Sequence, residues 1–493
     1  MNKQQQRANA INTFIATLKS EGLWDSVKAS CIMAGWDNIS GALTPLVGAA
    51  PTNVSGGFTN SDYDSGVGLK GDGTSYLDSE VANNSDFGGT VADPQNDKHV
   101  SLYVTTAATT DNPSGRAYIG AGGNDSGATN IVARQIAPLS MASRANNATA
   151  SENGSNDATG FMGISRSVSP SFLARIEGVN YTNTETSQAP QSGNIYVYRL
   201  NWSAHTGLTC NVGLSFYSIG TAISDLAVLD SAVSTLMTTL RGIDEQGMDA
   251  DALTYIRAVE TADGGFLETP VKIAIDNLVK GLKADNLWDS IKASCLLCGP
   301  RTLNGALVPL VGGAPTNVNN NFVDADYNRE TGLVGDGSTK RLTQQNLATP
   351  LQDSAHQSIF LTTHDPATIQ THIAEGPASG TNGLTQISLA GGGVFMRSRE
   401  GTGSSIAGNP AGLLGSSRSS PANYVRRQAG INTTISAAST GVPSQTIVIF
   451  STTGFSQVSS SRLAFYSIGE SISDLALLDA RVTALVTSIG AAL

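Results

Sequence analysis

The sequence predicts a mainly β protein: two tandem antiparallel β-sandwich domains of the jelly-roll type, with short flanking helices and a helical linker. Three observations support this prediction. They are a long internal repeat, a composition poor in charge and rich in glycine, and many short alternating segments separated by turn residues. Short strands with polar turns between them are typical of sandwiches and jelly rolls.

The internal repeat starts with segment 23–54, which returns at 287–318 with 21 of 32 positions identical, no gap and an offset of 264 residues. A period of this length corresponds to a whole domain rather than to a solenoid repeat. Later the motif FYSIG occurs at 216–220 and again at 465–469, with an offset of 249 residues. We therefore expect a first domain at 1–240, an acidic and partly helical linker at 241–268, and a second domain at 269–493.

The composition limits the classes of partner. Charged residues make up 14% of the chain, against roughly a quarter in an average protein, and 53 residues are glycine. The net charge of -11 argues against nucleic acid as a partner, because phosphate binding needs clustered lysine and arginine. The N-terminus has no apolar core of signal-peptide length, and no run approaches the roughly 20 apolar residues of a membrane span. We expect a soluble protein with no membrane insertion.

Apolar spacing predicts the helices. Residues 3–20 form an amphipathic helix, and residues 23–33, with Trp24 and Cys31 on one side, form a second. Residues 252–259 form a helix in the linker. Thr269 and Pro270 are a good helix start, after which Ile273, Leu278 and Leu282 repeat the apolar face of the first helix. A last helix follows each FYSIG, with Asp225 or Asp474 in its first turn, where an acidic residue is favourable.

Alternating segments predict the strands. Segments 99–104 and 356–361 are equivalent, as are 194–200 and 445–451. Asp72-Gly73, repeated at 336–337, predicts a hairpin turn between two strands. The Ser-Arg-Ser segments at 165–167 and 417–419 predict another strand in each copy, and residues 121–156 predict strands interrupted by long polar loops.

The order of these elements resembles that of a known class of modules. A GDG turn, central strands, a Ser-Arg-Ser strand and a closing FYSIG strand that enters a DLA-type helix resemble concanavalin-A-like (laminin-G-like) modules. In particular, the two repeats and the leader LWDSIKASCLLCG resemble uncharacterised structural proteins of tailed bacteriophages, including phages of cyanobacteria. The likeness covers roughly 23–240 and 270–490. It implies a virion protein made in the host cytoplasm.

We find no sequence support for catalysis. Glycoside hydrolases with the resembled fold carry Glu and Asp at alternate positions of one strand, because hydrolysis needs two carboxylates about 5–10 Å apart. No such pattern occurs, and segments 194–200 and 445–451 contain no carboxylate. Cys295 and Cys298 form a C-x-x-C without the second pair that a zinc ribbon needs, and Ala34 stands in the first copy where Cys298 stands in the second. We expect Cys31 and Cys295 to be buried thiols.

Other polar candidates also have plain structural explanations. His99 and His356 open equivalent strands, and a ligand role would need partners that the sequence does not show. His205, His364 and His372 have no metal-binding spacing. Calcium at the GDG turns would need six to eight oxygens, and the acids near the first turn (Asp62, Asp64 and Asp72) are matched in the second copy by Asp326 and Asp336 only. Trp24 and Trp288 are expected to be buried anchors rather than sugar platforms.

The sequence therefore predicts a non-catalytic structural protein of a virion, a capsid decoration or a tail or fibre component, without cofactor or metal. Its partners would be other virion proteins and further copies of the chain. The helical leaders are the expected assembly surfaces, because amphipathic helices outside a sandwich must bury their apolar faces. The alternative is a glycan-binding adhesin that contacts host surface glycans. A polysaccharide-degrading enzyme is disfavoured.

Overall fold

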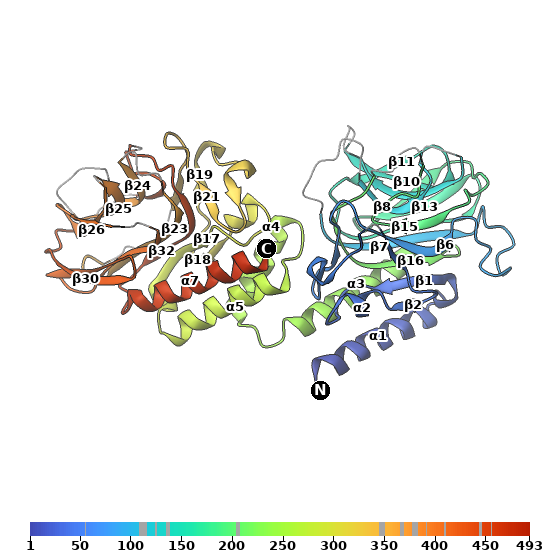
Figure 1. The fold of residues 1–493 in the computed structure, drawn as a ribbon, viewed down its shortest axis with the longest axis horizontal. Helices are drawn as coiled ribbons and strands as arrows, with labels where there is room; N and C mark the ends of the chain where they lie inside the picture. Colours follow the sequence, from blue (N-terminus) through green and yellow to red (C-terminus); the bar gives the residue numbers. More distant parts are fainter. Residues whose placement is uncertain are drawn as a thin grey trace. The chain divides into compact units, whose positions relative to one another are not determined.

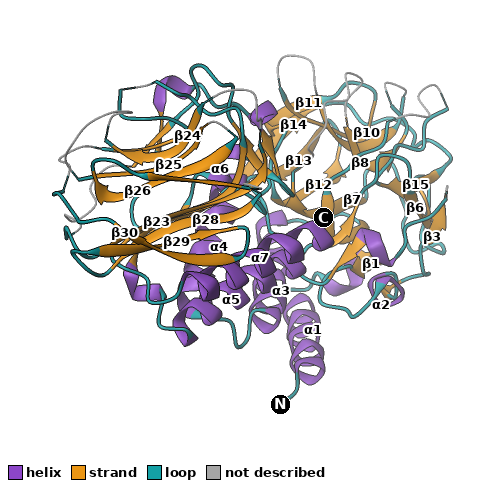
Figure 2. Ribbon diagram, turned by 60° about the vertical axis from the view of Figure 1, so that its left-hand side comes forward, coloured by secondary structure: helices purple, strands orange, loops and turns teal. Residues whose placement is uncertain are grey.

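The computed structural model describes residues 1–493 apart from 55, 108–115, 124–125, 135–138, 204–207, 345–350, 365–368, 377–382, 391, 409–410, 443–445 and 455, and it leaves out the side chain at 390. The chain forms two compact units. Unit 1 comprises residues 1–246 and 264–269, and unit 2 comprises residues 247–263 and 270–493. Each unit is an antiparallel β-sandwich with helices on one side of its strands, as Figures 1 and 2 show.

Unit 1 contains one larger and one smaller sheet. The larger sheet is built from β1 (Val27–Ile32), β2 (Pro45–Val47), β4 (Tyr63–Asp64), β5 (Gly68–Lys70), β7 (Lys98–Thr106), β12 (Gly160–Val168), β13 (Ser171–Ile176), β14 (Val179–Thr184) and β16 (Gly213–Gly220). Its main order is β14-β13-β12-β7-β16-β1-β2, and β5 joins it through β16. The smaller sheet is built from β3 (Thr52–Val54), β6 (Tyr76–Ala82), β8 (Arg116–Ala121), β9 (Ala128–Ala133), β10 (Ser140–Asn147), β11 (Ser151–Ser155) and β15 (Asn194–Val197). Its order is β11-β10-β9-β8-β15-β6-β3.

Unit 2 repeats this topology. Its larger sheet contains β17 (Ile291–Leu296), β18 (Pro309–Val311), β20 (Tyr327–Asn328), β21 (Gly332–Val334), β23 (Ala355–Thr363), β28 (Gly412–Arg418), β29 (Asn423–Gln428), β30 (Ile431–Ser436) and β32 (Arg462–Gly469). Its smaller sheet contains β19 (Thr316–Asn317), β22 (Leu342–Gln344), β24 (Gln370–Glu375), β25 (Leu384–Ala390), β26 (Gly393–Glu400), β27 (Ser404–Ala407) and β31 (Ile447–Ile449). The orders are β18-β17-β32-β23-β28-β29-β30 and β19-β22-β31-β24-β25-β26-β27.

Each core lies between the two sheets, because alternate residues of a strand point to opposite faces. In unit 1 Leu102, Ile119 and Tyr217 meet there with no exposed surface, and in unit 2 Ile359 and Ile373 take corresponding places. Burial of this apolar surface is the main stabilising contribution, at about 25 cal/mol for each Å² removed from water. The predicted pair of β-sandwich domains is confirmed.

A helical layer covers the outer face of each larger sheet. In unit 1 it consists of α1 (Lys3–Ser20) and α3 (Leu226–Asp244), which pack side by side (Figure 1). Phe14 of α1 reaches Phe216 of β16 with an edge-to-face ring contact at 6.0 Å. In unit 2 the layer consists of α5 (Thr269–Ala284) and α7 (Leu475–Ala492). The short helices α2 (Ile39–Ala42) and α6 (Leu303–Ala306) lie between the first two strands of each larger sheet.

The stretch 241–268 is divided between the two units. Helix α4 (Ala250–Asp263) belongs to unit 2, where Asp263 accepts hydrogen bonds from the backbone N–H groups of Arg301 and Thr302 at 2.7 and 2.9 Å. Segment 264–269 belongs to unit 1, where the Phe266 N–H donates to the carbonyl of Thr105 at 2.9 Å. The helix predicted at 252–259 is confirmed within α4.

The predicted second helix at 23–33 is wrong. After one 3-10 turn at Trp24–Ser26, the chain forms β1, which pairs with β16 and β2. One face of β1 contacts the core between the sheets, and the other face contacts the helical layer. Apolar residues therefore occupy both faces of the strand, and their spacing resembles that of a helix. Cys31 and Cys295 are therefore buried in strands.

Two further expectations need correction. The turn at Asp72-Gly73 does not close a hairpin, because β5 pairs with β16 in the larger sheet while β6 pairs with β3 and β15 in the smaller one. It carries the chain from one sheet to the other. Ile273 is 46% exposed and does not share the buried face of Leu278 and Leu282.

Candidate functional site

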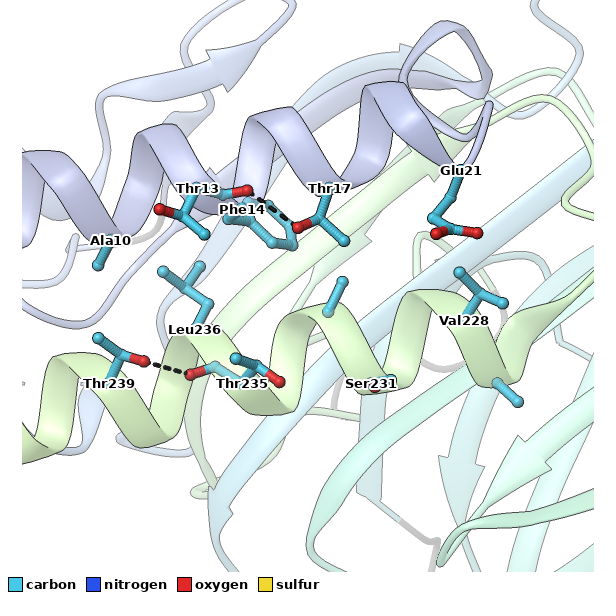
Figure 3. A pocket seen from close by; sticks show the side chains of 12 residues that line it. Ala10, Thr13, Phe14, Thr17, Glu21, Val228, Ser231, Thr235, Leu236 and Thr239 are labelled. Carbon is cyan, nitrogen blue, oxygen red and sulfur yellow. Dashed lines mark hydrogen bonds between the residues drawn. The ribbon is translucent and has the colours of Figure 1, made fainter.

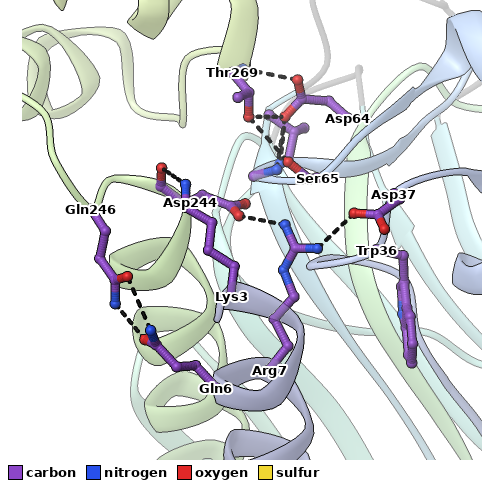
Figure 4. Close-up of polar contacts among 12 residues, drawn as sticks. Lys3, Gln6, Arg7, Trp36, Asp37, Asp64, Ser65, Asp244, Gln246 and Thr269 are labelled. Atoms are coloured by element: carbon purple, nitrogen blue, oxygen red, sulfur yellow. Dashed lines mark hydrogen bonds and ion pairs between the residues drawn. The ribbon is translucent and has the colours of Figure 1, made fainter. Parts of the chain in front are cut away.

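Polar side chains fix α1 to the far end of α3 in unit 1 (Figure 4). Arg7 lies between Asp37 and Asp244, with a guanidinium nitrogen 2.8 Å from a carboxylate oxygen of each. The Lys3 ammonium donates to the carbonyl of Asp244 at 3.0 Å, and the side chains of Gln6 and Gln246 bond to each other. The start of α1 thus meets the end of α3, so the two helices run antiparallel.

An open groove lies between these two helices (Figure 3). Its volume is about 490 Å³, within the range of roughly 300–1,000 Å³ that is usual for ligand sites. Phe14, Ala232 and Leu236 form its floor and are at most 7% exposed. The other lining residues are Ala10, Thr13, Thr17, Glu21, Ala227, Val228, Ser231, Thr235 and Thr239.

The walls of the groove are less polar than their sequence suggests. The Thr17 hydroxyl donates to the Thr13 carbonyl at 3.0 Å, and the Thr239 hydroxyl donates to the Thr235 carbonyl at 2.8 Å (Figure 3). These bonds return each hydroxyl to its own helix and leave the methyl groups to line the groove. The groove therefore combines an apolar floor with partly apolar walls.

One carboxylate stands at the end of the groove. Glu21 is exposed, lies at the C-cap of α1 and lines the groove (Figure 3). The C-terminal end of a helix carries partial negative charge, so an acidic group there is favourable only beside a cation. Among the residues that the structure describes, Glu21 has no ion-pair partner.

In unit 2 an arginine links the two corresponding helices. The repeat offsets align Glu21 with Asp285 and Ala232 with Arg481. Arg481 forms two bonds with Asp285, from Nε to Oδ2 at 2.7 Å and from Nη2 to Oδ1 at 3.1 Å. The arginine lies across Gly281, where an added Cβ would be 2.6 Å from its Cδ. The pair lowers the pKa of Asp285.

A second surface lies on the outer face of the smaller sheet in unit 1. Tyr76 in β6 and Tyr196 in β15 alternate with core residues of their strands and are half-buried. Their ring centroids are 4.7 Å apart, and the guanidinium of Arg199 lies 4.7 Å from the Tyr76 centroid. Asp78 accepts from the Asn194 amide at 2.9 Å. Burial, followed by the negative charge of Asp78, raises the pKa of Tyr196, so its phenol remains a donor at neutral pH.

This tyrosine face has no counterpart in unit 2. Strand pairing aligns Tyr76 with Arg341 and Tyr196 with Val448. The two repeats therefore share a scaffold but differ in both of their candidate binding surfaces.

The histidines at 99 and 356 have a structural role. His99 Nδ1 is 2.6 Å from the carbonyl of Thr221, so it carries the proton, and Nε2 is 3.0 Å from the Ser218 hydroxyl. His356 repeats the arrangement with Glu470 and Ser467 at 2.6 and 3.1 Å. Burial lowers the pKa of both imidazoles to about 4. Each neutral histidine thus binds the end of the last strand of its unit, β16 for His99 and β32 for His356.

The remaining histidines are scattered. His372 is buried beside the Ser459 hydroxyl at 2.9 Å, and burial lowers its pKa to about 3. His364 is exposed. His205 lies outside the described residues.

The cysteines are buried thiols, as predicted for Cys31 and Cys295. Cys31 lies 3.5 Å from the Tyr217 hydroxyl, and the Tyr466 hydroxyl lies 3.3 Å from Cys295. Burial raises the pKa of Cys31 to about 11 and that of Cys295 to about 12. These thiols are not poised for nucleophilic chemistry.

The GDG turns use their carboxylates internally. Asp72 accepts from the N–H groups of Thr74 and Ser75 at 2.7 and 2.6 Å, and Asp336 accepts from those of Ser338 and Thr339 at 2.9 and 2.8 Å. In the described part of the chain, no three His, Cys, Asp or Glu side chains gather where they could hold a metal ion.

The tryptophans are only partly buried. Trp24 and Trp288 are partly exposed, and the ammonium groups of Lys19 and Lys283 lie 5.2 and 5.4 Å from the ring centroids. Trp24 packs against the apolar cluster that includes Phe14, so the expectation of buried anchors is met only in part.

By length and composition alone, α7 is apolar enough to cross a membrane, which corrects the expectation that no segment approaches this limit. In this structure the apolar face of α7 is buried in unit 2. Its buried residues include Leu478, Val482, Leu485 and Ile489. Its Asp479 pairs with Arg427 at 2.8 Å.

Sequence reasoning missed both candidate surfaces. The groove depends on the exchange of Ala232 for Arg481 between aligned helices, a signal that the repeat alignment contains. The tyrosine face joins Tyr76 and Tyr196, which are far apart in the chain and meet only through the pairing of β6 with β15.

Comparisons with known proteins do not assign the chain to a family. No protein-family model matches the chain, and no curated protein matches it. Solved structures that are similar include mouse laminin alpha1 chain domains LG4-5, at 10% identity and a TM-score of 0.22, over 77% of this chain and 84% of that one. The botulinum neurotoxin serotype D binding domain matches at 10% identity and a TM-score of 0.29, over 41% and 52% of the two chains. The Ruminococcus gnavus IT-sialidase CBM40 bound to α2,3-sialyllactose matches at 12% identity and a TM-score of 0.21, over 28% and 83%. The fold class of this chain, a pair of antiparallel β-sandwiches, rests on its own sheet topology.

Proposed function

We propose that the chain is a non-catalytic structural protein of a tailed-phage virion, placed in the capsid decoration or in the tail or fibre, and that it acts through contacts with other proteins. The observation that carries the proposal is the open groove between α1 and α3 in unit 1, whereas Arg481 links the corresponding helices of unit 2 by its bond to Asp285. One copy of the duplicated layer is thus self-sufficient, and the other offers an unfilled site.

The chemistry of the described residues supports a non-catalytic role. The histidines at 99 and 356 and the buried cysteines are used in internal contacts, and burial shifts their pKa values away from neutrality. General acid–base catalysis needs a group that titrates near the working pH and reaches a substrate. The resemblance of the repeats to phage structural proteins supports the virion setting.

Particle composition tests this proposal directly. Virions of the phage or prophage whose genome carries this sequence would be purified, treated with protease-free nuclease and analysed by quantitative mass spectrometry. We expect the chain at a fixed copy number relative to the major capsid or tail proteins. Recovery only in the soluble fraction of infected cells, with none in particles, would contradict the virion role.

A stable assembly is also expected to need the leader helix. Removing residues 1–20 takes away one wall of the groove and uncovers the apolar floor, so the truncated protein should assemble less well or become less soluble. Size-exclusion chromatography with light scattering measures the first effect and thermal unfolding the second. A truncated protein that assembles and melts like the full chain would rule out this use of α1.

The tyrosine face supports a second candidate function, glycan binding. Two half-buried rings next to a carboxylate, an amide and a guanidinium offer both an aromatic face for sugar C–H groups and fixed partners for hydroxyls. The sialidase CBM40 among the similar structures is described with a bound sialyllactose.

A glycan array followed by saturation-transfer NMR tests this candidate. We expect millimolar to micromolar affinity, which corresponds to about -4 to -8 kcal/mol. Substituting Tyr196→Ala should abolish the signal, and the matched control Val448→Ala in unit 2 should leave it unchanged. An array that stays blank at high protein concentration would exclude glycan binding.

A further inference from the structure

We propose that the groove between α1 and α3 of unit 1 binds an arginine side chain presented by a protein partner, and that the guanidinium pairs with Glu21. This inference rests on the proposed function, since it names the partner chemistry of the same groove. It commits to one occupant because unit 2 places an arginine on the carboxylate that aligns with Glu21.

Unit 2 provides the template. Its α7 supplies Arg481, whose stem crosses α5 at Gly281 and whose guanidinium meets Asp285 one turn later with two bonds of 2.7 and 3.1 Å. A paired, two-bond contact between a guanidinium and a carboxylate is stronger and more directional than a single bond. The pair also places a cation at the C-terminal end of α5, where the helix dipole favours it.

Unit 1 keeps the receiving half of this arrangement and lacks the donating half. Glu21 holds the carboxylate at the end of α1, but Ala232 replaces the arginine, and Thr17 replaces the glycine over which it would lie. The space left is the groove of about 490 Å³, which is enough for an arginine together with neighbouring atoms of its chain (Figure 3). An exposed acid at a helix end without a cation is the unsatisfied member of the pair.

The lining of the groove favours arginine over other residues. Phe14 and Leu236 form an apolar floor against which the methylene stem of an arginine can pack while its charged head stays at the open end. Lysine has a compact ammonium that cannot form the paired contact, and it is more strongly hydrated. A purely apolar side chain would give the Glu21 carboxylate no cationic partner.

Peptide titration of the full-length chain tests the proposal. The probe is acetyl-Ala-Ala-Arg-Ala-Ala-amide, and the matched peptides carry lysine or citrulline at the centre. Ligand-observed saturation-transfer NMR measures binding. We expect the arginine peptide to bind at one site per chain, and the citrulline peptide to bind at least tenfold more weakly. Equal binding of the arginine and citrulline peptides, or no binding of either, would overturn the proposal.

Three variants locate the site. Glu21→Gln is an exposed substitution that leaves the helices intact, and it should reduce arginine-peptide affinity at least tenfold. The double variant Thr17→Gly/Ala232→Arg rebuilds the unit 2 arrangement in cis and should abolish binding while the circular dichroism spectrum is kept. Arg481→Ala opens the second groove and should raise the capacity from one to two peptides per chain. Wild-type affinity in Glu21→Gln would refute the assignment.

The two proposals can fail separately. If the chain is present in purified particles but the arginine peptide does not bind, the arginine assignment falls and the virion role stands. If the peptide binds as expected and the chain is absent from particles, the groove chemistry stands and the virion role falls.

Discussion

Arginine 418 should be the most costly single side chain to remove from unit 2. It is completely buried and donates four hydrogen bonds to carbonyl oxygens, from Nε to Ser398 at 2.7 Å, from Nη1 to Ser420 at 2.9 Å and Asn423 at 3.2 Å, and from Nη2 to Ala437 at 2.9 Å. Because Ser398 belongs to the smaller sheet and β28 to the larger, the guanidinium ties the two sheets together at one edge.

The expected cost follows from these contacts. Burial lowers the pKa of Arg418, but the guanidinium still titrates far above neutral pH and remains charged. Arg418→Met keeps an apolar stem and removes every donor, which leaves the carbonyls without their partner. Leaving a buried acceptor without its donor costs about 1–3 kcal/mol, so the four carbonyls predict a cost of at least about 4 kcal/mol. For a unit of this size each kcal/mol lowers the melting temperature by about 2–4 °C, so a cost of about 4 kcal/mol predicts a fall of about 8–16 °C.

Differential scanning calorimetry of the full chain is the assay, because distant sites act independently and only the unit 2 transition should move. Arg166→Met is the matched control in unit 1. Arg166 also makes four bonds. One, to the Ala145 carbonyl, is short at 2.5 Å, but the other three are longer, at 3.1 Å to the Ser171 carbonyl and 3.5 Å to the Val168 carbonyl and the Asn147 amide oxygen, so its loss should cost less. A fall of less than about 3 °C for Arg418→Met, or equal shifts for the two variants, would refute the reasoning.

Three other outcomes are expected. The bonds of His99 and His356 depend on neutral imidazoles, whose pKa is about 4 in the folded chain and about 6.5 in the unfolded chain, so the free energy of unfolding is highest above about pH 6.5 and falls by about 3 kcal/mol for each histidine as the pH drops towards 4. Urea unfolding between pH 7 and 4 measures this fall. A His99→Gln/His356→Gln variant with the same dependence of stability on pH would contradict it. Asp474 caps α7 by accepting from the Ala476 N–H at 2.7 Å, so Asp474→Ala should cost about 1 kcal/mol in unit 2, whereas no loss by chemical denaturation would show that the cap is dispensable. The four buried cysteines should resist a thiol reagent in the native chain and all react in denaturant, and rapid native labelling of any of them would show that the cores open readily.

Much of the fold could be predicted from the sequence. Repetition fixed the number of units, and the strong alternation of segments such as β7 and β23 showed where central strands lie. The helix at 3–20 and the helix after each FYSIG were also clear, because one apolar face contacts a sheet and the other meets water. These elements obey a single periodicity, so local pattern is enough.

The errors arose where one segment is covered on two sides or where local turns serve distant partners. Segment 23–33 is apolar on both faces because β1 lies between the core and the helical layer, and no periodicity separates a buried strand from a buried helix in that case. The Asp72-Gly73 turn has the local chemistry of a hairpin, but the flanking strands do not pair with each other, and each has a partner more than a hundred residues away, β16 for β5 and β15 for β6. The candidate surfaces were hidden for the same reason, since they depend on which strands and helices become neighbours.

The antiparallel helices of unit 1 have a consequence for how such a module can be reused. Lys3 and Gln6 lie beside Asp244 and Gln246, so the chain enters and leaves the unit at nearly the same place. The first strand and the last are also hydrogen-bonded neighbours within the larger sheet. A domain whose two ends lie close together can be duplicated in tandem without passing the chain through a packed interior. For the same reason it tolerates insertion into another chain and circular permutation. The two copies can then differ at single positions without loss of the fold: Arg481 links α7 to the end of α5 in unit 2, whereas Ala232 stands at the aligned position of unit 1 beside an open groove.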